Sequence, residues 1–290
     1  MTNAAFIVAL ALAPLIHARY AMGTVCEVAA HDLAAIEAAF AEAARIESML
    51  STWSDDSELA RVNRGEATPS RELQALLEQT LDWSRKTQRA FDPRVKALVE
   101  VWRTRQDGTL PSSDSIANAL QQPQIEEGAF GKGYAIDRML ASQPAVTMIN
   151  FGGQIAVRGP LEVSVADPAD RAKPVLAFEL RDASISTSSG SEKTFAVDGR
   201  RFSHILDPRT GEALPPRGSV SVIAPEALTA DILSTALYVM GEDDGLRWAD
   251  ANGVAAIFIT PHRQIRLSAA AREHVRGLRL LDRNFRLKDR

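Results

Sequence analysis

A stretch in the second half of the chain, RFSHILDPRTG at residues 201–211, concentrates side chains that can do chemistry. It holds a histidine, an aspartate, an arginine and a threonine, and it is interrupted by a proline and closed by a glycine. A histidine has an ordinary pKa of about 6.5, so His204 could exchange a proton with a substrate near neutral pH. A lone histidine is more often structural, and the stretch by itself leaves both interpretations open.

A second chemical pattern lies in TADILSTALYVMG at residues 229–241. Asp231 and Thr235 are four residues apart, so a helix places both on one face. A carboxylate and a hydroxyl supply the hard oxygen ligands that Mg²⁺ prefers, and Mg²⁺ keeps open positions for phosphate oxygens. The alternative is that Asp231 only caps the start of a helix.

Two glycine-rich segments could approach a ligand closely. The first, EEGAFGKGYAID at 126–137, exposes backbone N–H groups and carries Lys132, which together suit a phosphate. It lacks the Gly-Lys-Ser/Thr ending of a P-loop, so a plain loop leading into a helix is the alternative. The second, INFGGQIAVRG at 149–159, runs from a strand into paired glycines, which suits a ligand-facing turn or a β-bulge.

Two further segments are rich in small polar side chains. STWSDDSELARVN at 51–63 predicts a helix that begins near Ser57, and its Trp53 could stack on a planar ligand or lie half-buried. SISTSSGSEKTF at 184–195 is either a flexible loop or a lining that hydrogen-bonds polar oxygens.

The elements that must position these residues can be read from the hydrophobic pattern. Residues 19–31 predict one strand, and Asp32 predicts the cap of an amphipathic helix. A second amphipathic helix covers the leucine-rich region 73–81 and is stopped by AFDP at 90–93, because a proline cannot continue a helix. Residues 106–124, rich in Gln, Ser, Asp and Pro, are the most linker-like part of the chain.

The second half alternates short β-like runs with turns and contains two helical patterns, around 229–241 and 243–251. Helices come early and strands come late, and there is neither an internal repeat nor a long linker. We therefore expect a single α+β domain of irregular mixed α/β type.

Composition narrows the class of protein. The chain has 290 residues, 46% hydrophobic and 24% charged, as in ordinary soluble enzymes, and its net charge of −4 argues against a nucleic-acid-binding protein. Residues 262–290 contain nine Lys and Arg against three Asp and Glu. This basic C-terminal tail is either a solvated segment or a docking surface for an acidic protein or membrane. The single cysteine, Cys26, is expected to be a buried strand residue.

The N-terminus carries an apolar run from Ala4 to Ile16, shorter than the about 20 residues that span a bilayer. Residues 1–18 resemble a signal peptide that is cleaved after the small residue Ala18, which leaves 19–290 as the mature domain. No Lys or Arg precedes the run, however. The alternative is an intact N-terminal segment on a cytoplasmic protein.

Seven motifs, in order, resemble the FAD:protein FMN transferases, the ApbE flavin-transferase family: AMGT, LSTWSDDSELARVN, AFDP, GKGYAID, NFGGQI, ISTSSG…FSHILDPRTG and ADILSTALYVMG. The resemblance runs from about Tyr20 to about Thr260, and HILDPRTG and ADILSTAL are its most specific parts. It implies an ApbE-like domain that binds FAD and Mg²⁺ and cleaves the FAD pyrophosphate. FMN is then transferred to a Thr or Ser hydroxyl of an acceptor protein through a phosphoester, and AMP is released.

The same resemblance implies roles for individual residues. His204 matches the base that takes the proton of the acceptor hydroxyl. Asp231 and Thr235 match the metal ligands, with a backbone carbonyl near Gly131 completing the set. Lys132 matches a position beside the diphosphate. The residues that match FAD-holding positions are Met22, Trp53, Ala90, Phe91, Asp92, Glu126, Lys132, Leu206 and Ser234.

Three positions depart from the family pattern. Gln154 stands where an acidic residue usually follows the paired glycines, Glu126 where Asp is common, and Gly131 where Ala is common. Two other functions remain open, a metal-dependent FAD pyrophosphate hydrolase that forms FMN and AMP, and a non-catalytic FAD-binding protein.

The resemblance also implies partners and a location. Family acceptors are often subunits of membrane redox complexes on the outer side of the cytoplasmic membrane. The expected location is therefore the periplasm or that outer face, which agrees with export directed by residues 1–18.

Overall fold

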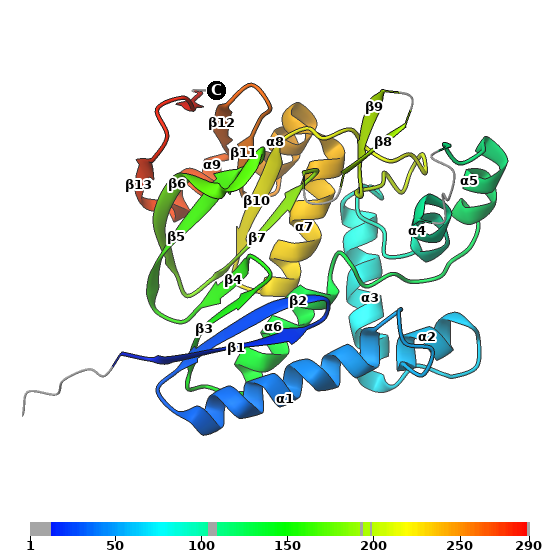
Figure 1. Cartoon of the computed structure of the whole chain (residues 1–290), viewed down its shortest axis with the longest axis horizontal. Coiled ribbons are helices and arrows are strands. Elements are labelled where there is room, and N and C mark those ends of the chain that lie inside the picture. The colour runs from blue at the N-terminus through cyan, green and yellow to red at the C-terminus, as the bar shows by residue number, and fades with distance from the viewer. Residues whose placement is uncertain (1–12, 104–108, 192–193, 198, 289–290) are drawn as a thin grey trace, which may run out of the picture.

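The helices and strands that carry or flank the polar clusters of the sequence are arranged around one central sheet (Figure 1). The computed structural model describes residues 13–103, 109–191, 194–197 and 199–288. The helices in this part of the chain are α1 (Leu33–Leu50), α2 (Glu58–Asn63), α3 (Arg71–Lys86), α4 (Lys96–Arg103), α5 (Ser113–Leu120), α6 (Gly131–Ser142), α7 (Ala227–Met240), α8 (Glu242–Ala251) and α9 (Ala269–His274). The strands are β1 (Leu15–Ala21), β2 (Thr24–Ala30), β3 (Val146–Phe151), β4 (Gln154–Val157), β5 (Pro160–Asp167), β6 (Asp170–Arg181), β7 (Ser184–Ser189), β8 (Thr194–Val197), β9 (Arg200–Ser203), β10 (Ser219–Ala224), β11 (Ala255–Ile259), β12 (Gln264–Leu267), β13 (Arg276–Leu280) and β14 (Arg286–Leu287).

The central sheet has nine strands in the order β1-β2-β3-β4-β7-β10-β11-β12-β14. Neighbouring strands are antiparallel, except that β12 pairs with β14 in parallel. A second sheet has the order β13-β6-β5, and β8 and β9 form a separate hairpin. Strands that are distant in sequence, such as β4, β7 and β10, therefore lie side by side in the middle of the molecule.

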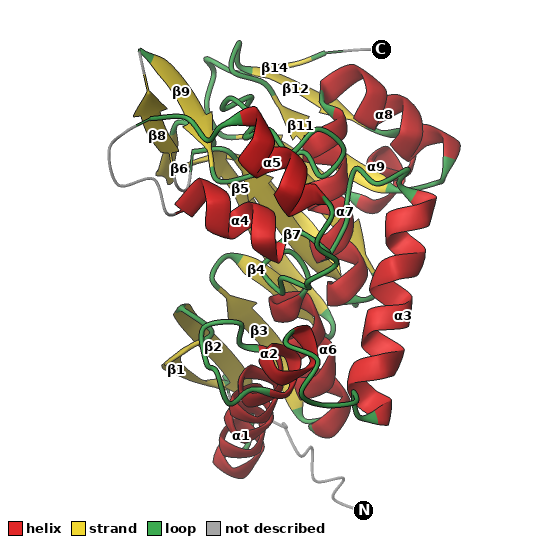
Figure 2. Ribbon diagram, turned by 90° about the vertical axis from the view of Figure 1, so that its right-hand side faces the viewer, coloured by secondary structure: helices red, strands yellow, loops and turns green. Residues whose placement is uncertain are grey.

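Both faces of the central sheet are covered (Figure 2). On β10, Val220 and Val222 pack against the cluster formed with α1, α6 and α7, whereas Ile223 packs with the second sheet and α9. On β11, Phe258 packs in the first of these clusters and Ile257 packs in the second. Because successive side chains of a strand point to opposite faces, this alternation builds two hydrophobic cores from one sheet.

The predicted fold class is confirmed, since the structure is a single mixed α/β domain with helices largely early and strands largely late. The expected cap at Asp32 is also confirmed, because its carboxylate accepts the Ala34 N–H at 3.0 Å. Ser57 caps α2 in the same way, accepting the Ala60 N–H at 3.0 Å. Cys26 is fully buried in β2, as expected, and burial raises the pKa of its thiol to about 12.

Three local predictions were wrong. Residues 19–31 form a hairpin instead of one strand, because Met22 and Gly23 have φ values of 44° and 76° and turn the chain between Ala21 and Thr24. Two left-handed residues suit the twist of a two-residue hairpin loop. The linker-like segment 106–124 contains α5, capped by Ser112.

The third concerns the end of α3. The helix stops at Lys86, before AFDP, because Gln88 and Arg89 have positive φ values of 52° and 62°. Left-handed residues end a helix without the help of a proline.

The basic segment 262–290 does not form a solvated tail, as far as the structure describes it. It supplies β12, α9, β13 and β14, and its Ile265, Leu267 and Phe285 are buried in the second core. Its Arg266 forms ion pairs at 2.8 Å and 2.7 Å with Glu242 and Asp243 at the start of α8. Part of the positive charge of this segment is thus neutralised by ion pairs within the fold.

The predicted signal peptide stays a prediction. Residues 1–12 lie outside the described residues, and Leu15–Ala21 form β1, an edge strand of the central sheet. Cleavage after Ala18 would leave Arg19, whose guanidinium pairs with Glu37 at 2.6 Å and lies 4.6 Å from the centre of the Phe40 ring. No helix in the described part of the chain is long and apolar enough to cross a membrane.

Candidate active site

A cavity of about 1010 Å³ opens where α6, α7, β7 and the His204 turn face the loops after α1 and α3. It brings together nearly all of the site residues expected from the sequence. Those that line it are Met22, Trp53, Ala90, Phe91, Asp92, Glu126, Lys132, His204, Leu206, Asp231 and Thr235. Gly131 and Ser234 lie behind its wall, Gly131 as the first residue of α6 and Ser234 as a fully buried residue of α7.

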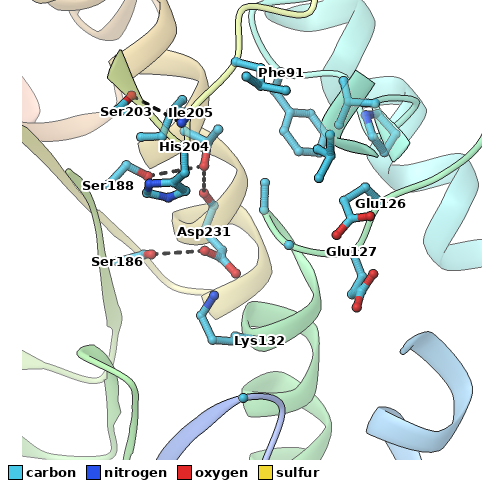
Figure 3. Close-up of a pocket in the computed structure, with 18 of the residues that line it drawn as sticks. Phe91, Glu126, Glu127, Lys132, Ser186, Ser188, Ser203, His204, Ile205 and Asp231 are labelled. Atoms are coloured by element: carbon cyan, nitrogen blue, oxygen red, sulfur yellow. Dashed lines mark hydrogen bonds between the residues drawn. The ribbon is translucent and has the colours of Figure 1, made fainter. Parts of the chain in front are cut away.

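Asp231 and Thr235 occupy one face of α7. Asp231 lies beside Ser186 and Ser188 of β7 (Figure 3). Asp231 is only 5% exposed, and its Oδ1 accepts the Ser186 hydroxyl at 3.3 Å. Ser188 Oγ lies 3.3 Å from Thr235 Oγ1 and 2.8 Å from Ser234 Oγ. Because the strand period is two, Ser186 and Ser188 share a face, and this face forms one wall of the cavity.

The sequence left open whether Asp231 is only a helix cap. In the structure it caps the neighbouring helix α6 and not its own helix. Asp231 lies in the second turn of its own helix, but its Oδ2 accepts the Gly133 N–H at 3.0 Å and so caps α6. In return, Asp137 of α6 accepts the N–H groups of Ala227 and Leu228, at 2.7 Å and 2.9 Å, and caps α7. Neither helix has a side-chain cap from its own N-cap residue. We call this exchange crossed capping.

Crossed capping depends on a close approach of the two helices. A Cβ atom at Gly133 would lie 2.6 Å from the Ala227 carbonyl oxygen and 2.8 Å from the Asp231 Cβ. No ordinary side chain fits in that space, so at least this glycine of GKGYAID serves helix packing. Burial raises the pKa of Asp137 to about 6, although the two N–H groups oppose that change.

Lys132 is the second residue of α6, and its side chain reaches toward Asp231 (Figure 3). Its ammonium group and the positive end of the α6 dipole face the same part of the cavity. The glycine-rich segment is therefore a helix start, one of the two forms expected from the sequence, and it presents positive charge to the site.

The opposite wall is acidic and carries the aromatic residue. Glu126 Oε2 accepts the Thr52 hydroxyl at 3.2 Å, and Glu127 Oε1 accepts the Thr52 N–H at 3.1 Å. These bonds hold the loop that carries Trp53, whose side chain is 73% exposed. The Arg103 guanidinium lies 4.0 Å from the centre of the Trp53 ring, so one face of the indole is covered by a cation.

Glu126 gives a prediction for pH dependence. Burial, assisted by repulsion from Glu127, raises the pKa of Glu126 from 4.5 to about 7. Folding thus favours the protonated carboxyl group, and the stability from this residue falls as pH rises from about 4.5 to 7. Glu126→Gln should remove that fall and raise the free energy of unfolding at pH 8 by roughly 1–3 kcal/mol.

The measurement is urea unfolding of both proteins at several pH values between 4.5 and 8. Glu78→Gln, which changes an exposed glutamate of α3, is the matched control and should follow the wild type. Parallel curves for wild type and Glu126→Gln would contradict the assignment.

The AFDP segment forms the apolar floor beside this acidic wall. Ala90 and Phe91 are buried, and Asp92 is 3% exposed. Burial alone would raise the pKa of Asp92, but hydrogen bonds from Arg94, at 2.8 Å and 2.9 Å, and from Arg89, at 3.1 Å, outweigh it and lower that pKa. Asp92 therefore acts as the anchor of this turn.

His204 lies at the start of a tightly bonded turn. The Asp207 carbonyl accepts the N–H groups of Thr210 and Gly211, and its carboxylate pairs with Arg209 at 2.7 Å. The Gly211 carbonyl accepts the Trp102 indole N–H at 2.8 Å, which fastens the turn to α4. His204 itself lines the cavity on the side of Ser188 and Asp231 (Figure 3).

Comparison with known proteins decides the family. A sequence model of the ApbE family matches residues 22–258, which is most of the chain and includes every residue that lines the cavity. The chain belongs to the ApbE family.

Relatives and solved structures agree with this assignment. The FAD:protein FMN transferase of Treponema pallidum is 31% identical and covers 93% of this chain and 90% of its own. The protein of that name from Escherichia coli K12 is 29% identical, covering 74% and 73%. The crystal structure of the ApbE protein from Thermotoga maritima superposes with a TM-score of 0.82 at 25% identity, covering 91% of this chain and 100% of that one. The apo flavinyl transferase ApbE of Pseudomonas stutzeri gives 0.75 at 25% identity, covering 91% and 98%.

Within this ApbE domain, the sequence did not single out several residues of the site. These are Gly133, Asp137, Glu127 and Arg103. Ser186 and Ser188 belong to the segment that the sequence offered as a possible polar lining, but they were not named individually. Strand alternation in SISTSS could have placed Ser186 and Ser188 on one face. The cross-helix bond between Gly133 and Asp231 joins residues 98 positions apart, and no local pattern indicates it.

The donor set beside α7 fits a Mg²⁺ ion. It offers a buried carboxylate and a hydroxyl, Asp231 and Thr235, which are hard oxygen ligands. Asp231 accepts only one bond at each carboxylate oxygen, so lone pairs remain for a cation. Among the described residues no group of three or more His, Cys, Asp and Glu is placed to hold a metal ion.

Proposed function

We propose that this ApbE-family chain transfers FMN from FAD to a Ser or Thr hydroxyl of an acceptor protein and releases AMP. The observation that supports this most is the single cavity that collects a histidine, a lysine, a carboxylate–hydroxyl pair and an aromatic ring. Its volume of about 1010 Å³ is large enough for a dinucleotide. The relatives named FAD:protein FMN transferase support the same reaction.

The chain's residues divide the work as follows. Trp53 offers its uncovered face to one of the planar rings of FAD, and the AFDP turn and Met22 contact the rest of the ligand. Lys132 and the start of α6 hold the diphosphate by charge. Asp231 and Thr235, with a backbone carbonyl near Gly131, would hold Mg²⁺, which when bound neutralises negative charge on the phosphoryl oxygens.

His204 takes the proton of the acceptor hydroxyl as its oxygen attacks the phosphorus on the flavin side of the diphosphate. The new bond joins that oxygen to phosphorus, and the bond between phosphorus and the oxygen that stays with AMP breaks. The tight turn behind His204 fixes the imidazole at the cavity wall, which favours a defined approach of the hydroxyl.

Incubation of the purified chain with FAD, Mg²⁺ and an acceptor protein tests the proposal. Transfer predicts a fluorescent acceptor whose mass increases by one FMN group, with one AMP released per label. AMP and free FMN without a labelled acceptor would indicate hydrolysis, in which water replaces the hydroxyl. FAD binding without AMP would indicate a non-catalytic FAD-binding protein.

We also propose that the chain is exported and that its acceptor is a subunit of a membrane redox complex. The apolar run Ala4–Ile16 followed by Ala18 supports export to the periplasm or to the outer face of the cytoplasmic membrane. N-terminal sequencing of the protein from cells tests cleavage after Ala18. Mass spectrometry for FMN-bearing peptides in cells with and without this chain identifies the acceptor.

A further inference from the structure

Two of the residues that line the cavity carry a buried side-chain oxygen with no hydrogen-bond donor in the described part of the chain. Four buried side-chain oxygens there lack a partner: Ser84 Oγ, Glu127 Oε2, Gln154 Oε1 and Ser219 Oγ. Only Glu127 and Gln154 line the cavity. A buried acceptor without a donor loses roughly 1–3 kcal/mol relative to one in water, so its place in a ligand site needs a reason.

The orientation of the Gln154 amide is fixed by its neighbour. Gln154 is 3% exposed, and its Nε2 donates to the Ala227 carbonyl at 2.8 Å. A carbonyl oxygen can only accept, so the NH₂ group must face Ala227. The amide oxygen is therefore the end that remains for a ligand.

The neighbouring hydroxyl group, that of Ser186, does not supply the missing donor. Ile155 pairs with Ile185 across β4 and β7, which places Gln154 beside Ser186 on the same face of the sheet. Ser186 has a single hydroxyl proton, and it donates that proton to Asp231. Asp231, when ionised, has no proton to give. This corner of the cavity thus presents acceptors that a ligand with donors would complete.

We propose that Gln154 Oε1 accepts a hydrogen bond from a hydroxyl of the bound nucleotide, on the ribityl or the ribose segment next to the diphosphate. The inference rests on the proposed function, which puts the diphosphate beside Lys132 and Asp231. At neutral pH the diphosphate carries no O–H donor, whereas both flanking segments carry several.

Gln154 thereby becomes a specificity-determining residue. A ligand that lacks the hydroxyl leaves the amide oxygen unpaired in the complex, and the affinity falls. An apolar side chain of the same length cannot tell the two ligands apart. The expected discrimination is roughly twofold to tenfold in Kd, the range of one net neutral hydrogen bond.

Calorimetric titration of wild type and Gln154→Met in metal-free buffer measures this contact. One arm compares ADP with 2′-deoxy-ADP and 3′-deoxy-ADP, and the other compares FMN with a flavin that bears a phosphoalkyl chain without hydroxyls. Wild type should lose affinity on deoxygenation in one arm, and Gln154→Met should bind both ligands of that arm equally. Discrimination in the ADP arm assigns the ribose, and discrimination in the flavin arm assigns the ribityl chain.

Two further variants keep the test decisive. Ser84→Ala removes a buried unpartnered oxygen away from the cavity and should discriminate as the wild type does. Gln154→Glu keeps a side-chain oxygen at the same distance from the backbone but loses the N–H that bonds the Ala227 carbonyl. It should therefore still bind the ligand with the hydroxyl more tightly than the ligand without it. The inference would be overturned if removal of the ligand hydroxyl lowered the affinity of wild type and Gln154→Met equally. It would also be overturned if a folded Gln154→Glu variant bound the ligand and its deoxygenated analogue with the same affinity. Failure of wild type to bind FAD at all would instead contradict the proposed function.

Discussion

Replacing Asp231 by alanine should lower FMN transfer roughly a thousandfold and leave the remaining activity insensitive to added Mg²⁺. A thousandfold loss corresponds to about 4 kcal/mol of transition-state stabilisation, within the several kcal/mol that a metal-bound phosphoryl group gains. Asp231 supplies the only carboxylate on this face of α7, and it is 5% exposed. If Mg²⁺ binds as proposed, the loss of Asp231 removes its anionic ligand.

The structure also shows why alanine alone is an ambiguous variant. Asp231 accepts the Gly133 N–H, so Asp231→Ala additionally uncaps α6. Asp231→Asn keeps one oxygen for that N–H and removes the charge. We expect this variant to unfold close to the wild-type temperature and to lose the calorimetric signal of Mg²⁺ binding measured in the presence of ADP.

A matched control comes from the other half of crossed capping. Asp137→Asn weakens the cap of α7 without changing the ligand set, because Asp137 faces Ala227 and Leu228. It should lower the unfolding temperature and retain a normal Mg²⁺ dependence of transfer. If Asp231→Asn also retained normal Mg²⁺ dependence, the assignment of Asp231 as a metal ligand would be wrong.

The second large effect is expected at His204. His204→Ala should slow FMN transfer by about 10²–10⁴-fold, the usual contribution of a general base. FAD affinity should change less than threefold, because the aromatic, lysine and AFDP contacts of the cavity remain. The variant keeps the bonds to the Asp207 carbonyl and the bond from Trp102 to the Gly211 carbonyl, so we expect it to fold.

Single-turnover labelling of an acceptor protein, with FAD binding followed separately by flavin fluorescence, measures the two quantities. His262→Ala changes an exposed histidine in the turn between β11 and β12 and serves as the control. Labelling by His204→Ala at a rate near that of the wild type would remove His204 as the base.

Local chemistry explains which parts of this site could be predicted from the sequence. Asp231 and Thr235 were placed on one face because the helix period depends only on spacing, and His204 was found because its polar turn is continuous in sequence. The caps at Asp32 and Ser57 are equally local. In each case neighbouring residues carry the whole physical reason.

The features that were not predicted depend on residues far apart in the sequence or on unusual backbone conformations. The hairpin at Met22 requires a left-handed methionine, which the residue type does not favour. The role of Gly133 depends on α7 lying against α6, and that contact is made by a chain segment 98 residues later. The linker-like composition of 106–124 did not indicate α5, whose Ile116 and Ala119 are buried only because α4 and the β8–β9 hairpin lie beside them.

Crossed capping has a consequence for the motions of the domain. Fraying at the start of α6 withdraws Gly133 from Asp231, and fraying at the start of α7 withdraws Ala227 and Leu228 from Asp137. We therefore expect the two helix starts to open and close together. A ligand that binds through Asp231 tightens both at once, so the amide hydrogens of a helix turn that it never touches become slower to exchange with solvent.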